Sequence, residues 1–307
     1  MPPKKKKPES PNSRFVVTTV EVEGRSEQRI VELPAFNPAP WTDNTTLGIV
    51  GTSVTRVDAT EKVTGRARYT ADIVRPGQLY AAIVRSTIPK GKITRFDSSV
   101  AAKLPGVFDI IGPGDAPART RLLPTDVLYA GQPIGAVCAT SEAAARRAVQ
   151  AIIVDYDRAP FASTFEDATA PEAPKVRPSG NLNPLGPVVL SRGNIDAGLI
   201  EADVVIEREY RTPVQLHTAL EPHGSAAEWE NDRLTIWEST QGIFRVRAEV
   251  AKGLGLPLTH VRVINDYMGG GFGAKNGAGA HTFIAALLAR RTGRPVRCIN
   301  DREGEQV

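Results

Sequence analysis

The stretch Val261-Arg-Val-Ile-Asn-Asp-Tyr-Met-Gly-Gly-Gly-Phe-Gly-Ala-Lys275 sets the organisation of this chain. Its first four residues, 261–264, are a short apolar run that predicts a buried strand, and a glycine-rich loop follows at 269–275. From 279 to 291 apolar residues recur at helical spacing, so the predicted order is strand, loop, helix. Glycines at such a junction permit positive φ angles and let backbone N–H groups approach an oxygen anion. The stretch therefore predicts a loop that can bind a ligand.

The residues of the loop alone leave several interpretations open. A P-loop is excluded, because Ala274 and Asn276 stand where that motif needs glycine and Ser or Thr. A dinucleotide-binding loop matches Gly269, Gly271 and Ala274 as G-x-G-x-x-A, with Asp301 after the next strand. The spacing of thirty positions from Gly271 to Asp301 is long for that role. A tight turn without a ligand is the third interpretation.

Composition limits the function classes. The 307 residues suffice for two domains, and 41% hydrophobic with 23% charged residues is ordinary for a globular protein. The net charge of +4 comes from the run 4–7 of four lysines, so nothing indicates a nucleic-acid surface. Two cysteines, Cys138 and Cys298, cannot supply four thiolates to an iron–sulfur cluster, and we expect both to be small buried residues. The absence of a disulfide framework and of a long apolar run favours a cytoplasmic location.

We expect an α+β fold in which residues 1–47, rich in Pro, Ser, Lys and Asn, are extended or disordered apart from one strand at 15–23. An α+β domain is predicted for 48–168, a Pro-rich connector for 169–188, and an α/β domain of strand–helix units for 189–307. The expected strands are 79–84, 107–111, 134–139, 152–156, 204–210, 234–237, 261–264 and 295–299. The expected helices include one capped by Ser141, one at 193–201 and one from Ile243 to Leu254.

Two further blocks lie upstream of the glycine loop, Val-Gln-Leu-His-Thr-Ala-Leu-Glu-Pro-His at 214–223 and Leu-Thr-Ile-Trp-Glu-Ser-Thr-Gln at 234–241. In this order and spacing, the three blocks resemble the molybdopterin-binding large subunit of the xanthine dehydrogenase/aldehyde oxidase family. The resemblance extends back to about residue 48 and covers most of the chain. Within it, Gly131, Pro133 and Val137 match the family pattern G-x-P-x-x-x-V. The resemblance implies an α/β hammerhead domain at 48–168 and the first part of a molybdopterin-binding domain at 189–307.

The resemblance also implies roles for individual residues. Gln241 matches a family glutamine that hydrogen-bonds an oxygen ligand of the molybdenum centre, and Phe272 and Gly273 match the pair that lies over the metal. Gly270 and Gly271 would allow the cofactor to approach closely. No residue of the chain is expected to bind the metal directly. Lys275 is interpreted either as a counter-charge for the cofactor phosphate or as a surface lysine.

Two departures from the family qualify the expected chemistry. Asn276 stands where purine-oxidising members have glutamate, so the resemblance favours an aldehyde or another N-heterocycle over xanthine. The general-base glutamate of the family is expected outside this chain, and Glu303 and Glu305 are interpreted as tail residues. No catalytic residue is therefore assigned, and the chain is expected to be inactive without the C-terminal part that family members have.

The segment around His217, Glu221 and His223 has a second interpretation. His-x-x-x-Glu-x-His could supply zinc ligands, although the spacing differs from H-E-x-x-H and Pro222 prevents a continuous helix. By resemblance the segment lies near the cofactor. Glu221 is then expected to accept hydrogen bonds from backbone N–H groups.

Taken together, the resemblance implies a molybdenum hydroxylase that oxidises an aldehyde or N-heterocycle. The cofactor would be molybdopterin, with the cytosine dinucleotide form allowed, and electrons would pass to an iron–sulfur small subunit and an FAD medium subunit. A second chain could supply the rest of the large subunit. The alternatives are a dinucleotide-binding oxidoreductase that uses Gly269, Gly271 and Ala274, and a non-catalytic scaffold or fragment without cofactor.

Overall fold

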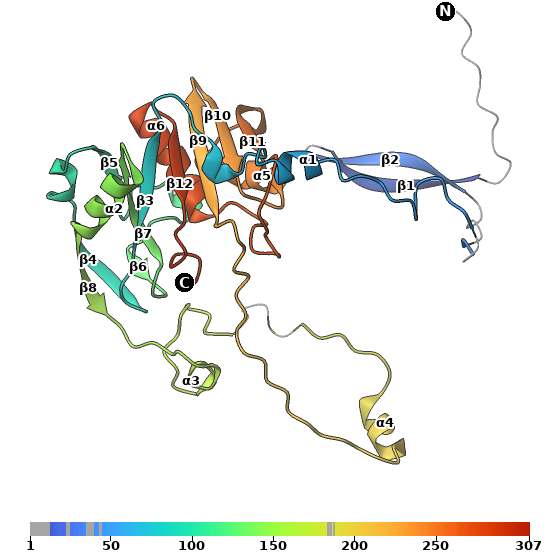
Figure 1. Cartoon of the computed structure of the whole chain (residues 1–307). Helices are drawn as coiled ribbons and strands as arrows, with labels where there is room; N and C mark the ends of the chain where they lie inside the picture. The colour runs from blue at the N-terminus through green and yellow to red at the C-terminus, as the bar shows by residue number, and fades with distance from the viewer. Residues whose placement is uncertain (1–12, 23–24, 35–39, 43–44, 183–185, 187) are drawn as a thin grey trace, which may run out of the picture. The chain divides into compact units, whose positions relative to one another are not determined.

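A computed structural model describes residues 13–22, 25–34, 40–42, 45–182, 186 and 188–307 of the chain (Figure 1). Contacts within the chain divide it into two units, residues 1–60 and 61–307. The first unit contains an antiparallel hairpin of β1 (Ser13–Val22) and β2 (Arg25–Pro34), in which Val17 lies opposite Ile30.

The strand expected at 15–23 is confirmed as β1, but the expectation that its neighbours lack regular structure is wrong for β2. β2 is rich in charged and polar residues, and its own sequence shows little of a strand pattern. Its backbone becomes a strand by pairing with β1, a cross-strand contact that composition does not report. Residues 1–12 of the predicted N-terminal segment lie outside the described residues.

The second unit is built on a seven-stranded mixed sheet with the order β11-β10-β9-β12-β3-β7-β5 (Figure 1). A three-stranded sheet has the order β6-β4-β8. The strands are β3 (Leu79–Arg85), β4 (Gly91–Asp97), β5 (Val107–Ile111), β6 (Asp126–Val127), β7 (Pro133–Ala139), β8 (Ile153–Arg158), β9 (Gly224–Glu230), β10 (Arg233–Glu238), β11 (Val261–Ile264) and β12 (Val296–Ile299).

The helices of the chain differ in length and burial. The α-helices are α1 (Ala59–Val63), α2 (Glu142–Gln150), α3 (Phe165–Thr169), α4 (Ile195–Glu201), α5 (Ile243–Leu254) and α6 (Ala280–Thr292). Short 3-10 turns are η1 (Thr70–Asp72), η2 (Ala101–Lys103), η3 (Ala118–Thr120) and η4 (Leu258–His260).

The large sheet is covered on both faces. On one face, side chains of α5 and α6 pack with residues of β3, β7, β9, β10 and β12 in the main hydrophobic core. On the other face, Ala148 of α2 packs with Val84 and Val137. Because side chains alternate along a strand, β3 contributes Leu79 and Ala81 to the first core and Val84 to the second. Cys138 and Cys298 are free and buried, as expected.

Sequence and structure agree on most strands and helices, but strands β4, β6 and β9 and helix α3 were not expected. The strand predicted at 204–210 is wrong: these residues form neither helix nor strand. Their apolar residues alternate, yet Ile206 is 76% exposed and none of the described strands pairs with the segment. Alternation makes a strand only where a partner supplies hydrogen bonds and a surface to bury one face.

The two predicted domains contribute strands to the same sheet. β12 from the C-terminal part pairs in parallel with β3, with Val296 opposite Leu79 and Cys298 opposite Ala81. β12 also pairs antiparallel with β9. The carboxyl end of β10 and the loop after β11 are thereby fixed on a common, well-packed frame.

Candidate functional site

The glycine loop joins β11 to α6, as predicted, and its backbone takes positive φ angles. Gly270, Phe272 and Gly273 have φ values of 101°, 51° and 97°. A Cβ at Gly271 would lie 2.5 Å from Oε1 of Gln241, so a larger residue would displace that side chain. The glycines are therefore needed both for the backbone angles and for the close approach of Gln241.

Three consecutive N–H groups of this loop, those of residues 270–272, have no acceptor within the part of the chain that the structure describes. The N–H groups on either side are engaged: Gly269 N donates to Glu221 Oε2 at 2.7 Å and Gly273 N to Gln241 Oε1 at 2.8 Å. Backbone N–H groups in a folded protein are nearly always paired. Successive N–H groups left free in a loop with left-handed angles form a concavity that suits an oxygen ligand or an anion.

Gln241 lies just beyond β10 and joins the end of that strand to the glycine loop. Its Oε1 accepts from Gly273 N, as above, and from Lys275 N at 3.4 Å, while its backbone N donates to Lys275 O at 2.7 Å. The side chain is exposed, and among the described residues its amide nitrogen has no acceptor. The structure thus brings together the predicted residues Gln241, Gly271 and Gly273 and leaves an amide donor free beside them.

Phe272 and Asn276 lie on the exposed side of the loop. Phe272 is 72% exposed and has a positive φ, a combination that is unusual for a large aromatic residue. Strained residues of this kind gather at functional sites. Asn276 Nδ2 donates to Gly273 O at 2.9 Å, so its amide is held against the same loop.

A buried ion pair lies beneath the loop. Lys275 Nζ is 3.5 Å from Glu221 Oε2 and donates to Glu221 O at 2.7 Å and to Ser239 Oγ at 2.6 Å. Ser239 Oγ donates in turn to Glu221 Oε2 at 2.8 Å. Glu221 also accepts from Thr70 N at 3.3 Å, so the expectation that it binds backbone N–H groups is confirmed.

The interpretation of Lys275 as a surface lysine is wrong. Its side chain is fully buried, and Nζ is surrounded by oxygen atoms of Glu221 and Ser239. Burial lowers the pKa of Lys275, and the charge of Glu221 acts in the opposite direction. The pairing of Lys275 with a cofactor phosphate stays a prediction. Its Nζ already has hydrogen-bond partners in Glu221 and Ser239.

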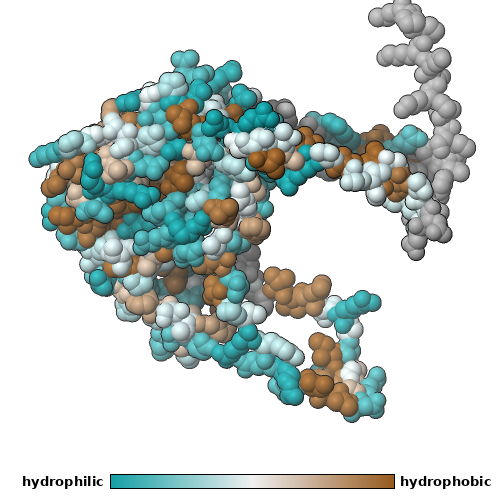
Figure 2. Space-filling model, in the orientation of Figure 1, coloured by the Kyte–Doolittle hydropathy of each residue, from teal (hydrophilic) through white to brown (hydrophobic). Residues whose placement is uncertain are grey.

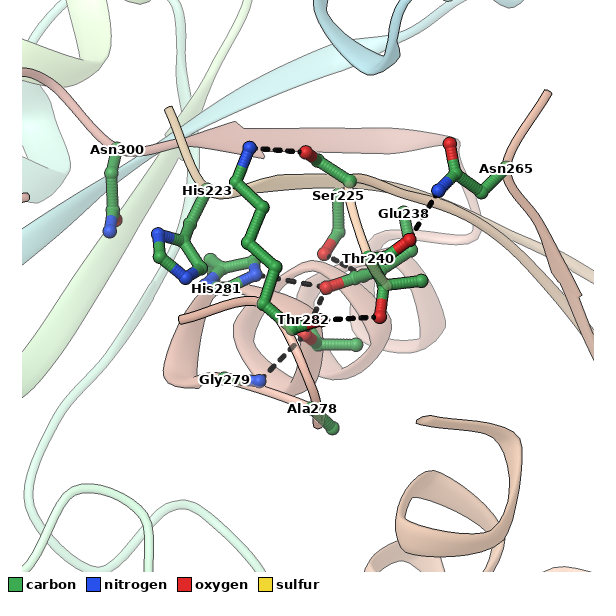
Figure 3. A network of polar contacts seen from close by, with 12 residues as sticks. His223, Ser225, Glu238, Thr240, Asn265, Ala278, Gly279, His281, Thr282 and Asn300 are labelled. Atoms are coloured by element: carbon green, nitrogen blue, oxygen red, sulfur yellow. Dashed lines mark hydrogen bonds and ion pairs between the residues drawn. The ribbon is translucent and has the colours of Figure 1, made fainter. Parts of the chain in front are cut away.

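A second buried carboxylate, Glu238, ties β9 and β10 to the start of α6 (Figure 3). Ser225 Oγ donates to its Oε2, while Thr282 Oγ1 and His281 Nε2 donate to its Oε1, each at 2.9 Å. Charged groups buried with several donors are strongly held. The network fixes where α6 begins and hence where the glycine loop must end.

A third polar contact connects the last residues of the chain to the segment before β9. His223 donates from N and Nδ1 to the Glu305 carboxylate, both at 2.9 Å, and from Nε2 to Ala274 O at 3.3 Å. The Glu305 side chain is only 5% exposed, so its interpretation as a tail residue is wrong. Burial alone would raise the pKa of Glu305, but hydrogen bonds from His223 and Asn300 lower it to about 2. The Glu305 hydrogen bond raises the pKa of His223.

Sequence reasoning missed Glu238, Ser239 and Glu305 as residues of the site. The only available signal is that polar residues 238–240 come directly after the apolar run 234–237, where a strand ends. A polar run at a strand end is ordinary in a loop, so that signal does not separate a buried network from solvent-exposed residues. Ser239 contacts Lys275, which lies 36 positions further along the chain, and Glu238 contacts His281, which lies 43 positions further along.

Two alternative interpretations fit the structure poorly. Among the described residues no group of three or more His, Cys, Asp and Glu is placed to hold a metal ion, and Glu221 and His223 are engaged with other protein groups. A dinucleotide-binding βαβ unit needs the strand after the loop helix beside the strand before it. Here β11 is an edge strand, and β10 and β9 separate it from β12, after which Asp301 follows.

Comparison with protein families identifies two regions. Residues 64–160 match a family model described as "Aldehyde oxidase and xanthine dehydrogenase, a/b hammerhead domain". Residues 178–307 match one described as "Molybdopterin cofactor-binding domain". The second region contains the glycine loop, Gln241 and the buried groups beneath them.

Curated relatives include the aldehyde oxidoreductase molybdenum-binding subunit PaoC of Escherichia coli K12, 35% identical over 82% of this chain and 35% of that protein. The nicotinate dehydrogenase large molybdopterin subunit of Eubacterium barkeri is 31% identical over 83% of this chain and 62% of that protein. The chain thus spans about a third of the PaoC length.

Solved structures of similar fold include quinoline 2-oxidoreductase from Pseudomonas putida 86, with a TM-score of 0.75 at 29% identity, covering 83% of this chain and 35% of that one. Aldehyde oxidoreductase from Desulfovibrio gigas gives a TM-score of 0.74 at 26% identity, covering 82% and 30% of the two chains. The expected fold, a hammerhead region followed by a molybdopterin-binding region, is confirmed.

Proposed function

Because the chain belongs to the xanthine dehydrogenase and aldehyde oxidase family, we propose that it holds part of a molybdopterin cofactor at the glycine loop. The observation that carries this proposal is the run of N–H groups at 270–272 beside the amide nitrogen of Gln241, none of which has an acceptor among the residues that the structure describes. A cofactor that presents oxygen atoms to these donors would complete hydrogen bonds that the protein leaves unmade.

The residues present fit such a group. Gly270 and Gly271 carry no side chain on the loop, so a ligand can reach their N–H groups without meeting a Cβ. Gln241 can donate through its amide nitrogen while its oxygen remains on Gly273 N. Phe272 presents an exposed ring beside these donors, which would exclude water from a bound ligand.

When bound, the cofactor supplies the molybdenum centre that hydroxylates a substrate carbon. The residues of this chain would bind and orient it, since the loop backbone and Gln241 are donors fixed by packed strands. We assign no general base to the chain. Asn276, a neutral amide held on Gly273 O, cannot exchange a proton with a purine, and this favours an aldehyde or another N-heterocycle as substrate.

We propose that electrons leave through partner subunits with iron–sulfur and FAD centres. Relatives of the chain are named as molybdenum-binding subunits, which supports an assembly in which redox centres lie on other chains. Among the described residues, no helix is long and apolar enough to cross a membrane.

The proposal is tested by the pterin content of the full chain purified from cells that make molybdopterin, measured as the fluorescent oxidised pterin, together with its molybdenum content. In the variant Gly271→Ala the new Cβ would lie 2.5 Å from Gln241 Oε1 and displace that side chain from the loop. Loss of one or two hydrogen bonds of about 1 kcal/mol each lowers the bound pterin about tenfold.

Gly198→Ala is the matched control, because Gly198 lies in α4 and a Cβ there would meet nothing within 4 Å. The control should retain as much pterin as the unmodified chain. Unmodified protein without pterin above the background of an unrelated protein would overturn the proposal, as would equal pterin content in the two glycine variants.

A further inference from the structure

Lys275 is a charged residue in an unusual place. Its side chain is fully buried, and it is the largest fully buried side chain among the described residues. Burying an ammonium group is costly unless an anion and several acceptors compensate, and a buried ion pair rarely stabilises a fold better than apolar residues would. A buried ion pair at this position therefore indicates a role in positioning nearby groups more than in stabilising the fold.

The ion pair joins the two ends of the glycine loop. Glu221 binds the first end, accepting from Gly269 N and donating from its own N to Gly269 O at 3.2 Å. Lys275 is the last residue of the loop, and its Nζ contacts Glu221 and Ser239. Its carbonyl is also fixed, since Thr240 Oγ1 donates to Lys275 O at 2.9 Å.

These contacts explain which loop N–H groups remain free. Glu221 and Gln241 engage the N–H groups at 269, 273 and 275, and Ala274 N donates to Gly271 O at 2.9 Å. Because both ends of the loop are fixed, at 269 and 275, residues 270–272 curve between them, and their N–H groups have no acceptor among the described residues. A loop released at one end could turn these groups toward water or toward other carbonyls.

We propose that Glu221, Ser239 and Lys275 form a clamp that positions the glycine loop for its ligand. These are positioning residues, since they act through the loop backbone. Cofactor retention as a consequence of the clamp rests on the proposed function. The conformation of the cofactor-free loop does not rest on the proposed function. The clamp and the proposed function can therefore be tested separately.

The test measures hydrogen–deuterium exchange of the cofactor-free full chain, in the peptide that covers 269–275. In Lys275→Met a side chain of similar length replaces the lysine and leaves the Glu221 carboxylate without its cation. The bonded N–H groups at 269 and 273–275 should then exchange at least about tenfold faster, while exchange in α2 and β7 stays unchanged. Lys252→Met is the matched control, because Lys252 is exposed on α5.

The double variant Glu221→Gln/Lys275→Met tests whether the residues act together. Removal of both charges should raise loop exchange no further than the worse single variant, because residues in one network are not additive. Additive effects would overturn the clamp, as would loop exchange at the wild-type rate in a folded Lys275→Met protein. Equal acceleration across α2, β7 and the loop would also overturn it, since Lys275 would then be a general stabilising residue.

Two further results keep the inferences apart. If Lys275→Met does not fold, Ser239→Ala removes one contact of the clamp and leaves both charges in place, and it should still accelerate exchange in the loop selectively. Pterin bound to the wild-type chain and lost in Lys275→Met supports both inferences. A wild-type chain without pterin defeats the proposed function, while the exchange data still decide whether the clamp exists.

Discussion

At the scale of single residues, the charged groups around the glycine loop are buried together with their partners, Lys275 with Glu221 and Glu305 with His223. The sequence indicated that Gln241 and the glycines belong to one site, and the structure places Gln241 against Gly271 and Gly273. It did not indicate that Lys275 and Glu305 are buried. Their burial depends on partners contributed by Glu221 and His223, which lie 54 and 82 positions away. Hydrophobic patterns report which apolar residues are buried but carry no information on compensated charges.

The His223–Glu305 contact predicts a dependence of stability on pH. Glu305 has its pKa lowered from 4.5 to about 2, so its contribution is complete above pH 4.5 and is lost as the pH falls toward 2. His223 has its pKa raised above 6.5, so its contribution is complete below pH 6.5 and is lost as the pH rises through the raised value. The pair therefore stabilises the fold most between about pH 4.5 and 6.5.

Urea midpoints between pH 3 and 9 test this dependence. Glu305→Gln removes the charge but keeps the size, and its midpoint should lie furthest below wild type within that window, approaching wild type toward each end. Glu303→Gln is the control, because Glu303 is exposed and its side chain has no hydrogen-bond partner among the described residues. Parallel curves for wild type and Glu305→Gln would show that the pair is not coupled to folding.

At the scale of elements, strands and helices with strong local signals were predicted well. β3, β5, β7, β10, β11 and α6 each follow from a local hydrophobic pattern, and Ser141 caps α2 as expected. β9 was missed because its sequence, Gly-Ser-Ala-Ala-Glu-Trp-Glu, has small residues where a strand usually has β-branched ones. β9 lies between β12 and β10, and a strand in this position can use small residues because its neighbours on both sides supply the hydrogen bonds.

Two helix caps offer a matched pair for testing which helices stabilise the fold. Ser141 Oγ accepts from Ala144 N at 3.2 Å, and Thr164 Oγ1 accepts from Asp167 N at 3.0 Å. α2 buries alanines against the sheet, whereas α3 has no buried residue. Ser141→Ala should lower the free energy of unfolding by about 1 kcal/mol. Thr164→Ala should leave it unchanged within about 0.3 kcal/mol, because α3 can fray without disturbing the core.

Equilibrium unfolding in urea, followed by far-ultraviolet circular dichroism, distinguishes these outcomes. Equal losses for the two variants would mean that α3 unfolds together with the sheet. No loss for Ser141→Ala would mean that α2 does not need its cap.

At the scale of the whole molecule, local patterns could not predict that the hammerhead and molybdopterin-binding regions share one sheet. β3 and β12 pair across more than two hundred residues of sequence, and no local signal fixes such a partner. Between them, residues 188–218 form an exposed stretch that contains α4 and many apolar side chains (Figure 2). Leu190 and Val188 are 97% and 94% exposed. The division into two domains at 169–188 stays a prediction, and the sheet continues across it.

The shared sheet predicts that the chain will survive a cut in this exposed stretch. A single protease site inserted after Ser191 should be cleaved in the folded protein, because the residues around it are exposed and lie outside every helix and strand. The two fragments should then co-elute in size-exclusion chromatography and separate only in denaturant. β12 would remain hydrogen-bonded to β3, and α6 would stay packed in the core that contains Leu79 and Cys138. The uncut protein with the same insertion is the control. Separate elution of the fragments would show that the pairing of β3 with β12 depends on an unbroken chain, and that the two regions are independent bodies.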